Sequence, residues 1–196
     1  MRCERIIAII LLINVVYAFI NVFQLGSFIP LVPLHEVFLA SIFLVVAASA
    51  FMNKSRLIFW SAIVFSLILI AKSEFVLGLF LTNQSLLLYD QSVTPILAIL
   101  YASVFTFLFF IAAFRMTSSN ILLRVVGILL ALDVAVLQLL GASDLMILLN
   151  LLLLGVFMAI LLQRTVQINT ALKCLAVGIL GFVIQHVVNE LPTLLN

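Results

Sequence analysis

The stretch ALKCLAVGILGFVIQHVVNE, residues 171–190, is apolar over most of its length and ends in a polar group. A continuous apolar run of this length is typical of a membrane-spanning helix, because about 20 residues cross the ~30 Å hydrocarbon core. Its final residues include four polar side chains: Gln185, His186, Asn189 and Glu190. Residues three and four apart share a helix face, so the last two are expected to point the same way as His186. A polar face on a membrane helix is unfavourable against lipid, so this face is expected to contact protein or water.

The whole chain has the composition of a membrane protein. Of its 196 residues, 67% are hydrophobic and only 8% are charged, against about 25% charged in an average soluble domain. The apolar runs are continuous rather than alternating, which favours helices over a transmembrane β-barrel. The sequence therefore predicts an all-α, polytopic integral membrane bundle, with residues 1–196 forming a single transmembrane domain. The net charge of +2 is too small and dispersed to indicate a nucleic-acid partner.

Seven apolar segments are expected to cross the bilayer. The N-terminal run could be a signal peptide, but it continues to Leu25 and exceeds the usual ~7–15 residues, so an uncleaved first span is favoured. Residues 75–94 are interpreted as an outer flap or a re-entrant piece, and they also contain polar positions. The spans are predicted at residues 6–25, 35–52, 57–74, 95–114, 121–141, 145–163 and 171–190.

Charged residues predict the orientation. With these spans, eight of the nine Lys and Arg residues fall on one side of the membrane, and Lys72 is the exception. Cytoplasmic connections are enriched in Lys and Arg. The N-terminus is therefore predicted inside and the C-terminus outside, and the favoured location is a bacterial inner membrane. The opposite side is expected to hold Glu36, Asp90, Asp144 and Glu190.

Polar residues inside the spans are the candidate site. In the first span, Asn14, Tyr17, Asn21 and Gln24 recur every three or four residues and form one helical stripe. The stripe has two interpretations. Its side chains form hydrogen bonds between helices, worth about 0.6 kcal/mol each, or they line one wall of a polar pocket.

Two charged residues are predicted inside the bilayer. Asp133 lies roughly 13 Å beyond Arg124 at 1.5 Å per residue, where an ionised Asp costs about 2.5–3.5 kcal/mol. It is interpreted either as a proton or cation relay or as a structural hydrogen-bonding residue. Lys72 lies in the outer quarter. It could pair with Asp133, Glu190 or an anionic ligand, or extend to the outer surface.

His35 and His186 are the two histidines of the chain, and both are predicted at outer ends of spans. With Glu36 and Glu190 they could bind a divalent metal. They could also be the axial ligands of a haem or form a proton-responsive cluster. Alternatively, each lies alone at the wet interface, and the cofactor stays unknown. Cys3 and Cys174 show no metal-ligand spacing and define no disulfide framework.

Three functions remain open. The favoured one is a transport component, either a small-solute or ion permease or the membrane subunit of a transport complex. Its outer polar pocket would include Asn21, Gln24, Lys72, Gln185, His186, Asn189 and Glu190, and Asp133 would couple protonation to occupancy. The second is a non-catalytic structural subunit whose sixth span docks on other membrane proteins. The third is a metal- or haem-binding redox protein or enzyme, which the lack of HExxH, GxSxG and phosphate-loop motifs disfavours.

Overall fold

The computed structural model describes residues 3–22, 35–73, 94–117, 120–139, 144–164 and 168–195. The regular structure in these residues is entirely helical, which confirms the all-α prediction. The bounds agree with the seven expected segments to within three residues, except that the last helix continues five residues further. The helices are α1 (Cys3–Val22), α2 (His35–Met52), α3 (Arg56–Lys72), α6 (Thr94–Met116), α7 (Ile121–Leu139), α8 (Asp144–Arg164) and α9 (Thr170–Leu195).

Three described helices are long and apolar enough to cross a membrane. The qualifying segments are Ile96–Met116, Met146–Arg164 and Thr170–Val188. A fourth, Glu36–Met52, is apolar but shorter. Crossing by all seven helices, and the orientation, stay predictions.

Local signals explain several helix ends. Asn120 lies before α7, and its Oδ1 accepts a hydrogen bond from the Leu123 amide at 3.2 Å. Asn169 does the same for the Ala171 amide at the start of α9, at 2.9 Å. These caps satisfy amides that have no partner within the first helical turn. Asn120 is therefore the N-cap of α7.

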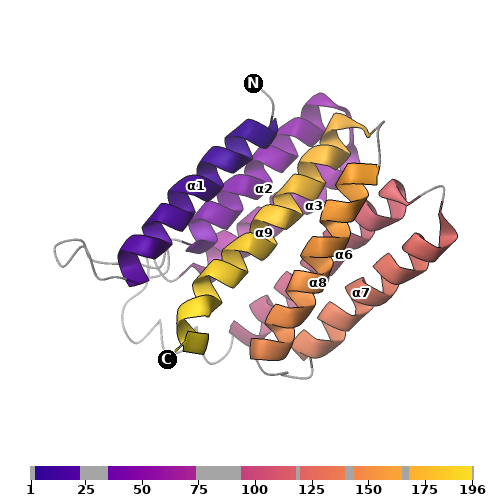
Figure 1. The fold of residues 1–196 in the computed structure, drawn as a ribbon. Coiled ribbons are helices and arrows are strands. Elements are labelled where there is room, and N and C mark those ends of the chain that lie inside the picture. Colours follow the sequence, from indigo (N-terminus) through magenta and orange to yellow (C-terminus); the bar gives the residue numbers. More distant parts are fainter. Residues whose placement is uncertain are drawn as a thin grey trace.

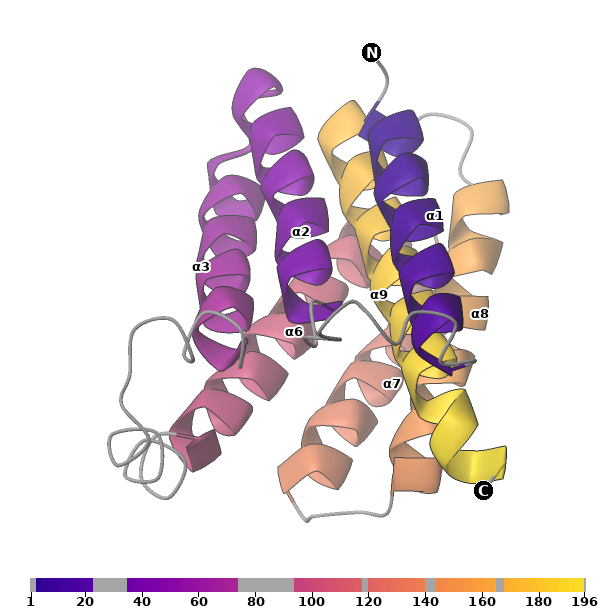
Figure 2. The same cartoon turned by 90° about the vertical axis from the view of Figure 1, so that its left-hand side faces the viewer.

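Helix α9 lies at the centre of the bundle. It runs diagonally across the molecule in Figure 1, and the view from above places it between α1 and α8. It packs against α1, α2, α3, α6 and α8, while α2 and α3 form a neighbouring pair in Figure 2. Two glycines permit this close packing. A Cβ on Gly178 would lie 2.8 Å from Val46 Cγ2, and one on Gly181 would lie 3.1 Å from Leu11 Cδ1.

A cluster of buried aromatic rings joins four helices. Phe43 on α2, Phe65 on α3, Phe105 on α6 and Phe182 on α9 are all at most 1% exposed. Phe105 stacks on Phe182 with ring centroids 4.2 Å apart, and Phe43 meets Phe65 edge-on at 4.7 Å. Aromatic pairs of this kind contribute about 0.5–1.5 kcal/mol beyond the burial of their area. The cluster fixes the register between α9 and the helices that carry the polar residues described below.

The described cations gather at one end of the bundle. Because successive helices alternate in direction, the start of α1 and of α9 lie at the same end as the α2–α3 turn, the upper end in Figure 1. We call this the basic end and the other the distal end. Trp60, 62% exposed, also lies near the basic end. The described cations of the basic end are Arg5, Lys54, Arg56, Arg115, Arg124, Arg164 and Lys173.

Candidate polar site in the distal half

Five helices bring polar side chains together in the distal half of the bundle. The register follows from the contact of Leu11 with Gly181. Helices α1 and α9 run in the same direction, so Asn14, one turn beyond Leu11, comes level with Gln185. Both side chains are fully buried. We call the set the polar layer: Asn14 on α1, Glu36 on α2, Lys72 on α3, Tyr101 on α6, and Gln185 and His186 on α9.

A hydrogen bond between Tyr101 and His186 lies at the centre of the polar layer. The Tyr101 hydroxyl is 3.0 Å from His186 Nε2, and His186 Nδ1 is 3.2 Å from the Phe182 carbonyl oxygen. A carbonyl can only accept, so Nδ1 carries the proton. In the neutral imidazole Nε2 therefore accepts from the Tyr101 hydroxyl. The imidazole also stacks on Phe182 with centroids 4.2 Å apart, which fixes its orientation.

Two charged side chains flank this hydrogen bond. Lys72 Nζ lies 4.8 Å from the centroid of the Tyr101 ring, a cation–π contact worth about 0.5–2 kcal/mol. Glu36 is buried and close enough to Tyr101 to interact with it electrostatically. Of the candidates expected from the sequence, the structure thus brings Lys72, Glu36, Gln185 and His186 into one region.

The side-chain amide of Asn14 provides unused hydrogen-bonding capacity in the polar layer. Asn14 is 0% exposed, and neither its Nδ2 nor its Oδ1 has a hydrogen-bond partner among the described residues. Ser73, the residue after Lys72, is also fully buried, and its Oγ has no hydrogen-bond partner within the described part of the chain. A buried polar group without a partner costs about 1–3 kcal/mol. Hydrogen bonds to these groups from outside the described residues would offset that cost.

Asp133 lies elsewhere. Its Oδ2 accepts a hydrogen bond from Asn150 Nδ2 at 2.6 Å, which links α7 to α8. Helix α7 packs against α6 and α8. The Asp133 side chain is exposed on the outside of the bundle, while Asn150 is buried. The structure therefore pairs Asp133 with Asn150 and not with Lys72, which contacts Tyr101.

Several predicted site residues fall outside the description. Gln24 and residues 75–93, most of the proposed flap, are not described, and neither are the side chains of Asn21, His35, Asn189 and Glu190.

Over the described positions, no three His, Cys, Asp or Glu side chains lie close enough to hold a metal ion. Both ring nitrogens of His186 are engaged by Tyr101 and the Phe182 carbonyl, so a metal or haem iron would have to displace one of them.

Sequence reasoning missed Tyr101. Nothing in the apolar run of α6 distinguishes it from the phenylalanines around it, and its role follows from contacts with α3 and α9. The sequence also gave no sign that Asn150 is the partner of Asp133, since the two residues lie on different helices. Searches against protein families, curated proteins and solved structures gave no match for the chain. Function must therefore be inferred from the chemistry of these side chains.

Proposed function

We propose that the chain is a multi-pass membrane protein whose seven helices all cross the bilayer, with the basic end in the cytoplasm. The segregation of charge supports this arrangement. The described cations other than Lys72 lie at the basic end, whereas Glu36 belongs to the distal half. Lys and Arg mark cytoplasmic connections. The distal half with its polar layer then faces the outside of the cell, in a bacterium the periplasmic side of the inner membrane.

We further propose that the polar layer binds a small anionic solute and that the chain is a transport component, as a permease or as the membrane subunit of a transport complex. The observation that carries this proposal is the convergence of Lys72, Tyr101 and His186 from three helices. An ammonium group inside a bundle marks a substrate or ion pathway by default. The buried Asn14 amide adds hydrogen-bonding groups to the same region.

Each residue has a distinct part in this proposal. Lys72, in the last turn of α3, attracts the anionic group from the distal side. The side-chain amide of Asn14 donates a hydrogen bond to the solute or accepts one from it. The His186 imidazole can take up a proton at Nε2 beside the solute when the Tyr101 hydroxyl turns from donating a hydrogen bond to accepting one. Proton coupling, which the sequence assigned to Asp133, thus fits His186 better, because Asp133 lies on the outside of the bundle.

Uptake into liposomes tests the proposal. Purified protein is reconstituted and offered labelled small carboxylates, phosphate and sulfate, with glycerol as a neutral comparison. We expect at least one anion to accumulate above the level of empty liposomes. Tyr101→Phe, which removes the hydroxyl and leaves the ring, should reduce that uptake several-fold. Ser103→Ala on the same helix is the control, since Ser103 is exposed and bonds only its own helix backbone. No accumulation of any anion, or equal uptake by Tyr101→Phe, contradicts the proposal.

A second candidate function is assembly with another membrane protein, and the Asp133–Asn150 pair favours it. Asp133 is exposed on an apolar helix surface that includes Leu129 and Leu132. Asn150 Oδ1 has no hydrogen-bond partner among the described residues. The Asp133 carboxylate offers an acceptor on the outside of the apolar surface, so the complementary partner is a membrane helix that carries a Lys or Arg at this depth.

Native mass spectrometry of protein extracted gently from its own membrane tests the assembly. We expect the wild type to retain a second polypeptide whose sequence has a Lys or Arg within a membrane span. Asp133→Leu should remove that polypeptide, because the partner cation would then be buried without a counter-charge. Leu122→Ala, an exposed position near the basic end of α7, should retain it. A wild-type chain that is recovered alone contradicts the assembly, as does a partner without an intramembrane cation.

A further inference from the structure

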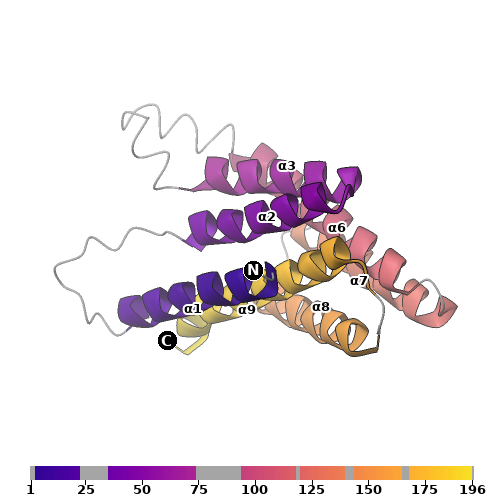
Figure 3. The same ribbon diagram turned by 90° about the horizontal axis from the view of Figure 1, so that it is seen from above.

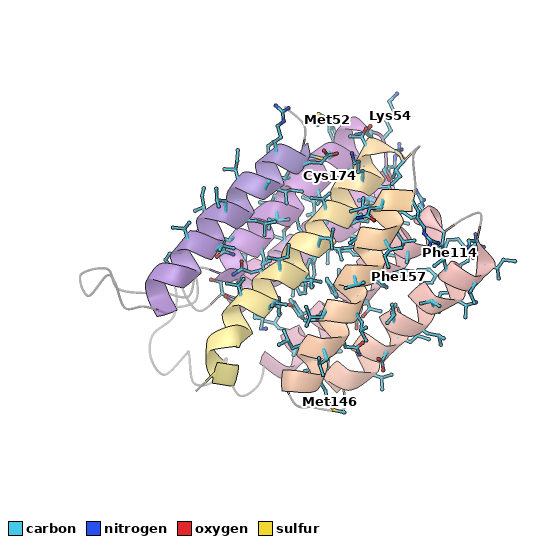
Figure 4. The ribbon with its side chains drawn as sticks, viewed as in Figure 1. Met52, Lys54, Phe114, Met146, Phe157 and Cys174 are labelled. Carbon is cyan, nitrogen blue, oxygen red and sulfur yellow. The ribbon has the colours of Figure 1, made fainter. Side chains whose placement is uncertain are left out.

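A second site lies at the basic end, away from the polar layer. A cavity of about 530 Å³ opens there between the first turns of α1 and α9 and the last turns of α2. Figure 4 shows Cys174 near this end of the molecule, beneath Met52 and Lys54. The cavity wall combines apolar side chains with polar and charged ones, among them Cys3, Glu4, Ser49, Asn53, Thr170 and Lys173.

An ion pair fixes α1 against α9 beside this cavity. Lys173 Nζ lies 2.8 Å from Glu4 Oε1. The adjacent residues on the two helices, Cys3 and Cys174, also meet. The Cys174 thiol is in hydrogen-bonding contact with the Cys3 thiol and with Ser49. Both cysteines are free thiols. Two cysteines 171 positions apart in the sequence are thus neighbours in space, and a salt bridge beside them holds their helices together.

The two thiols differ in access. Cys3 is half-buried and lines the cavity, whereas Cys174 is completely buried and packs in the core behind it. A small molecule in the cavity therefore meets Cys3 first. Such an arrangement, one accessible thiol backed by a second within reach, is what thiol–disulfide exchange requires.

We propose that Cys3 and Cys174 form a thiol–disulfide exchange site for low-molecular-weight disulfides that carry amino and carboxylate groups. Glu4 and Lys173 lie in the cavity wall as an ion pair, and a zwitterionic molecule can replace it by pairing its amino group with Glu4 and its carboxylate with Lys173. The cavity is large enough for one half of it. Cys3 is the attacking thiol, and Cys174 is the resolving thiol.

The reaction balances with the small disulfide as the oxidant. Cys3 loses its proton, and its sulfur attacks one sulfur of RSSR. The S–S bond of RSSR breaks, RS⁻ leaves and takes up a proton, and Cys3 carries a mixed disulfide. Cys174 then loses its proton, attacks the Cys3 sulfur and displaces the second RS⁻, which is also protonated. In sum, two protein thiols and RSSR give one protein disulfide and two RSH.

The disulfide would join the start of α1 covalently to the start of α9. These two helices also carry Asn14 and Gln185 of the polar layer. A covalent joint at the basic end would restrict any relative movement of α1 and α9. The oxidation state of the pair therefore acts on the same helices that form the distal site.

Oxidised glutathione is the probe for the test. Purified full-length protein is incubated with it, remaining thiols are alkylated with N-ethylmaleimide, and the intact mass is measured. We expect the wild type to lose two hydrogens, to keep no glutathione and to resist alkylation. Cys174→Ser should stop at one glutathione on Cys3. Cys3→Ser should stay unmodified, because Cys174 is buried. Cys174→Ala replaces Cys174→Ser if the latter elutes as an aggregate in size-exclusion chromatography.

Three results would overturn the proposal. A wild type that retains glutathione shows that Cys174 does not resolve the mixed disulfide. A wild type that is still alkylated at Cys3 after incubation shows that no exchange occurs. We expect the wild type to react at least several-fold faster with oxidised glutathione than with the uncharged 2-hydroxyethyl disulfide. Equal rates of reaction with the two disulfides would show that Glu4 and Lys173 do not contribute to recognition.

Discussion

Replacing Phe182 with alanine is expected to lower the free energy of unfolding by about 3–5 kcal/mol, the range for a large buried aromatic. Phe182 is 1% exposed and lies between two rings. It stacks on Phe105 on one side and on His186 on the other, each with centroids 4.2 Å apart. The substitution opens a cavity where α3, α6 and α9 meet. It also frees the imidazole from the surface that orients it toward Tyr101.

Phe110→Ala is the matched control. Phe110 also stacks on a neighbour, Phe114, at 5.6 Å, but it is 36% exposed on the surface of α6. Its loss leaves no closed cavity, and we expect a change below about 1 kcal/mol. Unfolding of both variants by titration with denaturing detergent gives the comparison. Similar losses for the two would show that the ring cluster is not the core that the structure describes.

Replacing Lys72 with methionine is expected to weaken the binding of an anionic solute about ten- to a hundredfold. Methionine keeps the unbranched apolar stem over the Tyr101 ring and removes the ammonium group, which lies 4.8 Å from the ring centroid. A hydrogen bond to a charged group contributes about 1.5–3 kcal/mol, and each 1.4 kcal/mol is about tenfold in affinity. The liposome uptake assay, with the anion that the wild type accumulates, gives the measurement over a concentration series.

Two comparisons separate binding from folding. Lys54→Met removes an equal charge from the exposed turn between α2 and α3 at the basic end and should leave the half-saturating concentration unchanged. Lys72→Arg keeps the charge and should retain part of the binding. Thermal unfolding of Lys72→Met must also be checked, because a cation in the last turn stabilises its helix. Unchanged uptake by a folded Lys72→Met protein contradicts an anion site in the polar layer.

The helices could be predicted from the sequence because long apolar runs, interrupted by polar and charged residues, leave little choice of secondary structure. Asn120 and Pro95 mark helix starts by local chemistry alone. The C-terminal end of α9 could not be predicted as well. It continues through Glu190 and Pro192 to Leu195, beyond the point where apolar character fades.

The polar layer could be predicted only in part, because periodicity shows which residues share a helix face but not which faces contact each other. The polar end of the stretch at 171–190 identified Gln185 and His186, and the depth of Lys72 in its apolar segment identified that lysine as unusual. Their connection through Tyr101 depends on the packing of α3, α6 and α9. The contact between Cys3 and Cys174 likewise exists only because α1 packs on α9. No spacing rule relates residues so far apart.

The central position of α9 has a consequence for the order in which the protein is made. Helix α9 follows the other six described helices in the chain, yet it packs against α1, α2, α3, α6 and α8. These helices are therefore synthesised before their common neighbour exists. Until then Phe105 on α6 lacks the Phe182 ring on which it stacks, and Tyr101 lacks its hydrogen-bonding partner His186. The central contacts of the bundle can form only after α9 has been synthesised, so we expect the packed core to form late and not progressively from the N-terminus.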